Sequence, residues 1–138
     1  MINRVYIDTN VFIDLLDNTR PFHKGSFDFI RDLIAEGKSI YINSDTLTNA
    51  FYILNKKTNL QKLISIMKKM LKLFIVVPIE NKDALEAFEL CQDEHCAFKD
   101  YEDALQYICA KKVKSDLIVT NDKGFIGLDI KLKNTLSN

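Results

Sequence analysis

The chain has 138 residues and an apolar content of 47%, which suits one folded domain over residues 1–138 with its own hydrophobic core. No apolar run approaches the roughly 18 residues of a membrane span, and no signal-peptide pattern opens the chain, so we expect a cytoplasmic protein with no membrane partner. The formal net charge is zero, which alone neither favours nor excludes a polyanionic partner.

The first half of the chain alternates short β-branched or aromatic runs with helical periods. The predicted strands cover residues 4–8 and 39–43, and the predicted helices cover residues 11–16, 22–36 and 44–54. Thr9 or Asn10 is expected to cap the first helix, and Ser44 or Asp45 the third, because such side chains accept hydrogen bonds from free helical N–H groups.

The second half continues the alternation. Helices are predicted over residues 60–71, 81–91 and 100–113, and strands over residues 73–77, 117–119 and, more weakly, 128–132. The strand over 73–77 is expected to be buried, and residues 92–98 to form a loop. Strands separated by helices indicate a parallel sheet with helices on both faces, and such sheets carry their sites beyond the carboxyl ends of the strands.

Charge is distributed unevenly. Residues 46–79 contain six lysines and no acid, whereas residues 80–103 contain nine acids and only Lys82 and Lys99 as cations. A basic arm beside an acidic centre suits an enzyme that holds a polyanion over metal ions. The alternative is two solvated helix faces of opposite sign.

Four acids stand where a site is expected. Asp8 ends the first strand, Asp122 follows the fourth, and Asp100 and Asp103 begin the helix between them. Each has a structural alternative as a turn or cap residue. Together, carboxylates gathered at strand ends and a helix start predict a site for a hard divalent cation such as Mg²⁺.

Three segments carry a family resemblance. Residues 7–11 (Ile-Asp-Thr-Asn-Val), 100–106 (Asp-Tyr-Glu-Asp-Ala-Leu-Gln) and 118–122 (Ile-Val-Thr-Asn-Asp) resemble, in order and spacing, the acidic motifs of the PIN domain family. The resemblance covers nearly the whole chain. It implies a three-layer α/β/α sandwich with a central parallel sheet of four or five strands. It also implies a Mg²⁺- or Mn²⁺-dependent endoribonuclease of the VapC-like toxin kind.

The resemblance assigns roles to residues. Asp8, Asp103 and Asp122 match the family's metal-binding acids, and Asp100 resembles an additional acid found in one branch of the family. The expected reaction is hydrolysis of an RNA phosphodiester bond by activated water. A small antitoxin protein and a second copy of the chain are the partners that the resemblance implies.

One position departs from the family pattern. Many members carry a Glu in the helix after the second strand, where this chain has Asn49. An amide brings no negative charge, so Asn49 is expected to orient a water molecule, and Asp45, one turn earlier, is either a compensating acid or an N-cap. The lysines outside the acidic centre that we expect to steady the RNA backbone are Lys56, Lys57 and Lys123.

Other functions are weaker interpretations of this sequence. A phosphatase with Asp8 as nucleophile requires a second acid two residues later, where Asn10 stands. A catalytically weak or inactive PIN-like module that binds RNA or protein is the non-enzymatic alternative, with Asn49 as its signature. A zinc site is disfavoured because only three ligands are near one another, Cys91, His95 and Cys96.

Overall fold

Five parallel strands form the central sheet of the computed structural model, which describes residues 1–95, 98 and 100–136. The strands lie in the order β3-β2-β1-β4-β5, and every neighbouring pair runs parallel. The strands are β1 Arg4–Ile7, β2 Ser39–Asn43, β3 Ile75–Val77, β4 Leu117–Val119 and β5 Lys131–Lys133. This arrangement confirms the predicted parallel sheet and its fifth strand.

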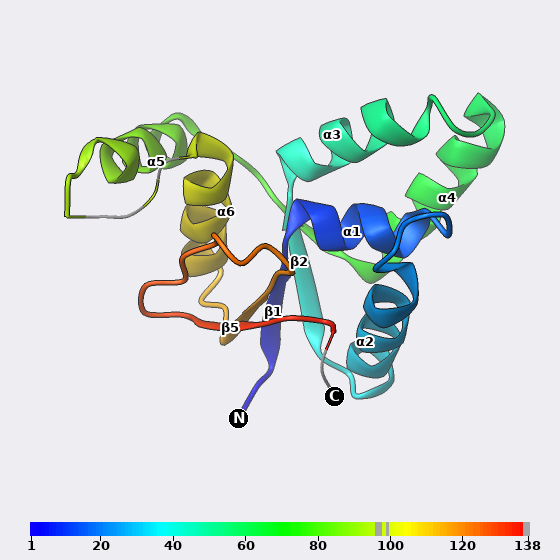
Figure 1. Cartoon of the computed structure of the whole chain (residues 1–138), viewed down its shortest axis with the longest axis horizontal. Coiled ribbons are helices and arrows are strands. Elements are labelled where there is room, and N and C mark those ends of the chain that lie inside the picture. The colour runs from blue at the N-terminus through cyan, green and yellow to red at the C-terminus, as the bar shows by residue number, and fades with distance from the viewer. Residues whose placement is uncertain (96–97, 99, 137–138) are drawn as a thin grey trace.

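Helices cover both faces of this sheet, which confirms the three-layer α/β/α architecture. In Figure 1 one group lies to the right of the sheet and the other to the left. The right-hand group is α1 Thr9–Leu16, α2 His23–Ala35, α3 Ser44–Leu54 and α4 Leu60–Leu73, and the left-hand group is α5 Asn81–Gln92 and α6 Tyr101–Lys112. The chain passes from the upper ends of β1 and β2 directly into α1 and α3 (Figure 1).

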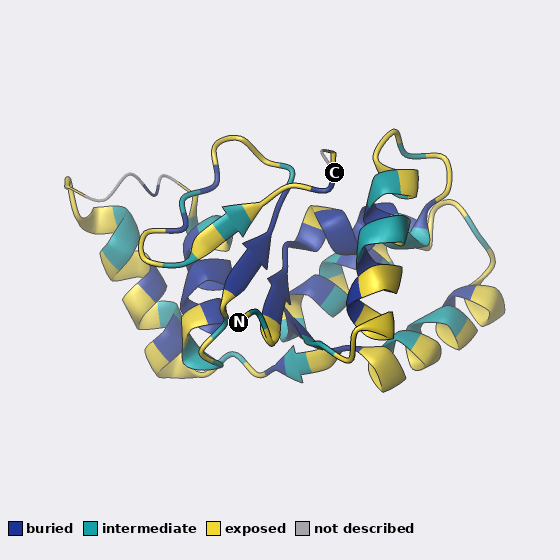
Figure 2. Ribbon diagram, turned by 90° about the horizontal axis from the view of Figure 1, so that it is seen from below, coloured by how far each residue is buried: buried dark blue, intermediate teal, exposed yellow. Residues whose placement is uncertain are grey.

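The strand residues point alternately into two separate cores, as the two-residue period of a strand requires. Val5 and Ile7 of β1 belong to the core under α1 to α4, whereas Tyr6 between them belongs to the core under α5 and α6. All three side chains are fully buried, and Figure 2 shows the central strands buried along their length. The central strands are therefore rigid supports for the residues that follow them.

Two strands differ from their predictions. The strand predicted as buried over residues 73–77 is an edge strand that begins at Ile75, because α4 continues through Leu73. Its Ile75 is 48% exposed. The fifth strand begins at Lys131 and not at Leu128, whose backbone has a left-handed φ of 48° that a strand does not accept.

The predicted caps of the first and third helices were also wrong. The N-cap of α3 is Asn43, whose side-chain oxygen accepts a hydrogen bond of 2.9 Å from the backbone N–H of Thr46. The N-cap of α1 is Asp8, which makes no capping hydrogen bond with its side chain. The Asp8 carboxylate is therefore free for contacts outside its own helix.

Across the described ranges, every helix is too short or too polar to cross a lipid bilayer. Within the loop predicted over residues 92–98, Cys96 and Ala97 lie outside the described residues, as does Lys99 just beyond it.

Candidate active site

Asp8 is a buried carboxylate at the carboxyl end of the central strand β1. Only 2% of the residue is exposed, and its backbone N–H donates to the carbonyl oxygen of Val119 at 3.0 Å. Its two side-chain oxygens each accept one hydrogen bond, from Gln106 Nε2 at 2.8 Å and from Thr120 Oγ1 at 2.7 Å. A carboxylate oxygen has two acceptor positions, so each oxygen keeps capacity for a further ligand.

The two donors to Asp8 are themselves fixed. Gln106 is completely buried, and its side-chain oxygen accepts a hydrogen bond of 2.9 Å from the backbone N–H of Thr9. The hydroxyl of Thr120 accepts a hydrogen bond of 3.1 Å from the backbone N–H of Asp122. This network joins the start of α1, the middle of α6 and the turn after β4 around a single carboxylate.

The pKa of Asp8 reflects these neighbours. Burial raises its pKa above the ordinary value of an aspartate, and the charge of Asp122 raises it further. The hydrogen bonds from Thr120 and Gln106 act in the opposite direction, because they stabilise the ionised carboxylate. The two donors therefore offset part of the shift that burial causes.

Asp103 lies half-buried in the first turn of α6 and is close enough to Asp8 for their charges to interact. Burial raises its pKa to about 7, and the carboxylates of Asp100, Asp8, Asp122 and Glu102 add to the shift in that order. The four predicted acids are therefore close enough to influence one another's charge, although they come from β1, α6 and the turn after β4.

Asp100 and Asp122 also act as structural residues, as their alternatives predicted. The Asp100 side chain caps α6 by accepting a hydrogen bond of 2.9 Å from the backbone N–H of Glu102. One oxygen of Asp122 accepts a hydrogen bond of 2.8 Å from the backbone N–H of Gly124. Each contact occupies one oxygen and orients the carboxylate, so the structural and site assignments are compatible.

Sequence reasoning missed several members of this environment. Glu102 is exposed, yet partial desolvation together with the charges of Asp100, Asp8 and Asp45 raises its pKa. Because Glu102 stands in the first turn of a helix, its sequence position indicated only a favourable interaction with the helix dipole. Asp45, which was weighed as a compensating acid, is exposed but close enough to Glu102 to influence it.

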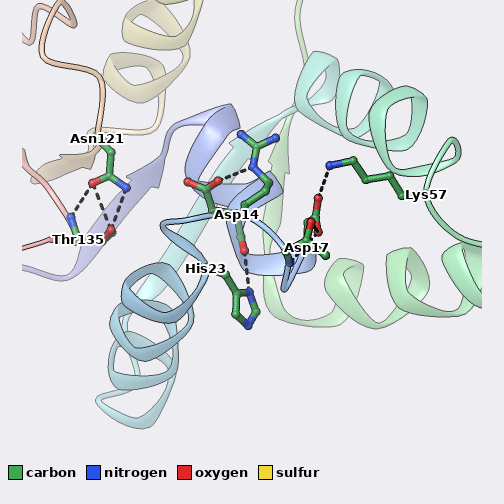
Figure 3. Close-up of polar contacts among 8 residues, drawn as sticks. Asp14, Asp17, His23, Lys57, Asn121 and Thr135 are labelled. Carbon is green, nitrogen blue, oxygen red and sulfur yellow. Dashed lines mark hydrogen bonds and ion pairs between the residues drawn. The ribbon is translucent and has the colours of Figure 1, made fainter.

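Across the described ranges, the remaining predicted site residues form no hydrogen bond or ion pair with the four acids. Asn49 is half-buried on α3, and across the described ranges no hydrogen bond joins it to the acids. Lys57 donates to Asp17 at the end of α1, at 2.7 Å (Figure 3). Lys56 lies over the Tyr52 ring at 4.3 Å, and Lys123 is exposed beside Asp122. Their proposed roles stay predictions.

Lys57 has a structural task where it lies. Its ammonium group and the Thr19 hydroxyl lower the pKa of Asp17 to about 2, although burial acts in the opposite direction. A cation that is tied to a buried carboxylate at the far end of α1 is poorly placed to contact a phosphate at Asp8.

The donor set fits a hard divalent cation. It consists of carboxylate oxygens, the ligands that Mg²⁺ and Mn²⁺ prefer, and their mutual repulsion is what a dication relieves. Within residues 1–95, 98 and 100–136, no group of three or more His, Cys, Asp or Glu side chains is placed so that it could hold a metal ion as the structure stands. Of the weighed zinc ligands, Cys96 lies outside the described residues.

Comparisons with known proteins agree with this geometry. Residues 4–124 match the family model described as PIN domain. Ribonuclease VapC1 of Aquifex aeolicus is 36% identical over 132 residues, which cover 96% of this chain and 90% of that protein.

Two solved structures share the fold at low sequence identity. VapBC2 from Rickettsia felis, bound to a DNA fragment from its promoter, matches with a TM-score of 0.72, 18% identity and coverage of 95% of this chain and 98% of that chain. VapC20 of Mycobacterium tuberculosis, a toxin that cleaves the sarcin-ricin loop, matches with a TM-score of 0.70, 14% identity and coverage of 90% and 98%.

Proposed function

The chain belongs to the PIN domain family, and on that premise we propose that it is an endoribonuclease that needs Mg²⁺ or Mn²⁺. The single observation that carries the proposal is the half-buried Asp103, whose pKa rises to about 7 beside three other predicted acids and Glu102. Carboxylates kept together at this cost to their ionisation are typical of cation sites.

RNA is the substrate that the relatives favour. The 36% identical relative from Aquifex aeolicus is named a ribonuclease, and its match covers nearly all of both chains. A phosphodiester is also the substrate that suits a site built from acids, because an anionic substrate approaches such a site only together with a cation.

Each acid has a distinct part in this proposal. Asp8, Asp103 and Asp122 would hold the cation, with Asp100 assisting directly or through water. A cation held by these residues would lower the pKa of the attacking water and offset the charge that develops on the phosphate oxygens. Thr120 and Gln106 favour the ionised form of Asp8 and fix its orientation. With a pKa of about 7, the Asp103 carboxyl is partly protonated near neutral pH, and a cation bound beside it would favour its ionised form.

The biological role follows from the family. We propose that the chain is the toxin of a toxin–antitoxin pair and that a small antitoxin protein is its partner. The structural neighbour VapC20 is described as a toxin. A homodimer remains part of the proposal on the same resemblance, and sedimentation of the purified chain would test it.

The experiment is RNA cleavage by the purified chain in Mg²⁺, Mn²⁺ or EDTA, with single-stranded and structured RNAs, beside Asp8→Asn and Asp103→Asn. Cleavage that needs both the cation and the two acids would support the proposal. Full cleavage by Asp8→Asn, or in EDTA, would contradict it. If Mg²⁺ neither supports cleavage nor raises the melting temperature, the inactive binding module becomes the better explanation.

A further inference from the structure

A hollow of about 440 Å³ opens beside the acids. Its walls come from α1, the turn between α1 and α2, and the turn after β4, and they include Asn10, Arg20, Phe22, Asn121 and Asp122. We call this hollow the Arg20 pocket. Because Asp122 belongs both to the acid cluster and to this wall, whatever fills the pocket lies next to the reacting phosphate. The volume lies in the range of small-molecule sites, roughly 300–1,000 Å³.

Arg20 is the cation among the residues that line the pocket. Its Nε donates to Asp14 Oδ1 at 2.5 Å, and the Asp14 side chain is only 5% exposed, whereas that of Arg20 is 27% exposed. The contact uses one edge of the guanidinium. Across the described ranges, its two terminal nitrogens form no hydrogen bond, so this planar donor pair is available for a ligand.

The turn that carries Arg20 is held in place from several sides. The Asp17 side chain accepts hydrogen bonds from the backbone N–H and the hydroxyl of Thr19, at 3.0 and 2.6 Å. The ring of His23 contacts the carbonyl oxygen of Asp14 through Nδ1 at 2.8 Å. Figure 3 shows Asp14, Asp17 and His23 around this turn. A guanidinium on a fixed turn loses less conformational entropy when it binds.

The opposite part of the pocket is apolar and amide-rich. Phe22 is 41% exposed, so part of its ring is accessible to a ligand. Asn10 carries an amide on the wall, and the Asn121 side chain is oriented by Thr135 (Figure 3). A ring face beside amides and a guanidinium suits a nucleobase joined to a phosphate.

Because the neighbouring acids are negatively charged, RNA binding beside them requires a cationic side chain. Five carboxylates surround the reacting position, and they repel RNA except where a cation offsets them. Lys57, our sequence-based candidate, is paired with Asp17. Arg20 stands instead beside Asp122 with two donors unused.

We propose that the Arg20 pocket binds the nucleotide adjoining the scissile phosphate, with Arg20 donating to that nucleotide's phosphate and Phe22 stacking on its base. Asp14 acts as a positioning residue for Arg20. The inference rests on the proposed ribonuclease function, which it deepens by placing a nucleotide subsite on one side of the acids.

The test is RNA binding in the Asp8→Asn background, so that the RNA stays intact, measured by anisotropy with a labelled single-stranded RNA over a range of KCl concentrations. Arg20→Met is expected to weaken binding about 10-fold and to reduce the salt slope by about 1. Phe22→Ala should weaken binding about 10-fold and leave the salt slope unchanged.

Two further variants guard the interpretation. Arg31→Met removes the same charge from the exposed face of α2, where Arg31 contacts Asp28 and Asp32, and should change affinity by less than about 2-fold. Arg20→Lys keeps the ion pair and the fold and loses the planar pair of donors. It should therefore bind RNA between wild type and Arg20→Met.

The outcomes separate the two proposals. Equal loss of RNA binding in Arg20→Met and Arg31→Met, or an unchanged salt slope in Arg20→Met, would refute the proposed subsite. Neither result would bear on the proposed ribonuclease activity. Loss of RNA binding in Arg20→Met alone, without cleavage by the wild type, would support the subsite and overturn the nuclease. No RNA binding by the parent chain would overturn both.

Discussion

Two equally buried aspartates in this chain have opposite surroundings. Asp8 and Asp83 are each 2% exposed. Asp83 contacts the ammonium of Lys112 at 2.8 Å, and this contact lowers its pKa although burial alone would raise it. The Asp8 side chain accepts hydrogen bonds from a hydroxyl and an amide, and its pKa is raised by burial and by Asp122.

The difference separates acids that hold the fold together from acids that need an external cation. Lys112 also donates to Glu80 at 2.8 Å and to the carbonyl oxygen of Pro78 at 2.9 Å, so it joins α6 to the start of α5. Across the described ranges, no lysine or arginine forms an ion pair with Asp8 or Asp103. A buried carboxylate without a cation costs stability, and such a cost is typical of functional sites.

The sharpest test of this comparison removes the negative charge of each acid in turn. Asp8→Asn should reduce metal-dependent RNA cleavage by at least about 100-fold and leave the melting temperature equal or higher. Asp83→Asn should instead lower the melting temperature and leave the cleavage rate per folded molecule nearly unchanged. Cleavage rates and thermal melts of both variants are the measurements. Parallel behaviour of the two would refute the distinction.

Removing the internal cation should destabilise the α5–α6 contact alone. Lys112→Met leaves the buried Asp83 without its partner, so we expect a loss of about 2 kcal/mol in the free energy of unfolding. Because the pKa of Asp83 is lowered in the fold, the contribution is present above its ordinary pKa and is lost as pH falls. Urea unfolding at neutral and acid pH measures it, and an equal loss at both pH values would argue against the ion pair.

The hydroxyl that supports Asp8 should matter less than the acid. Thr120→Val removes one donor to the ionised carboxylate, which raises the pKa of Asp8. We expect cleavage about 10-fold slower, with the acid limb of the pH–rate profile moved upward. Thr120→Ser keeps the hydroxyl and serves as the control, so an identical profile in both variants would contradict the assigned role.

The smallest expected effect is a pH dependence of stability without divalent cations. The pKa of Asp103 rises to about 7 in the fold, so the folded state binds more protons than the unfolded state in the range from pH 4 to pH 7. Stability should therefore fall by about 1 kcal/mol as pH rises through this range, after screening by solvent. Asp103→Asn should remove this fall, and a fall that persists would assign it elsewhere.

The sequence allowed the framework of the site to be predicted. Asp8 and Asp122 were assigned to one edge of the sheet because the carboxyl ends of neighbouring parallel strands meet there. Asp103 was assigned from its place at the start of a helix. These assignments depend on chain order, which the alternation of strands and helices reveals.

The contacts around these acids could not be predicted from the sequence. Helix α6 is buried on every side from Ala104 to Ala110, so no polar stripe indicated that Gln106 turns toward Asp8. The partner of Lys57 lies 40 positions away at the end of another helix, and the pairing depends on how α3 packs beside α1. Exposed lysines carry no local signal of such a partner.

The most direct test of the central claim is calorimetry of Mg²⁺ binding to the wild-type chain at pH 6.5, in two buffers of different ionisation enthalpy, beside Asp8→Asn and Asp83→Asn. We predict that Mg²⁺ binds the wild type with release of protons, since Asp103 must ionise, and that only Asp8→Asn weakens binding. Absence of Mg²⁺ binding in the wild type, or equally strong Mg²⁺ binding in Asp8→Asn, would contradict the claim that these acids bind a divalent cation.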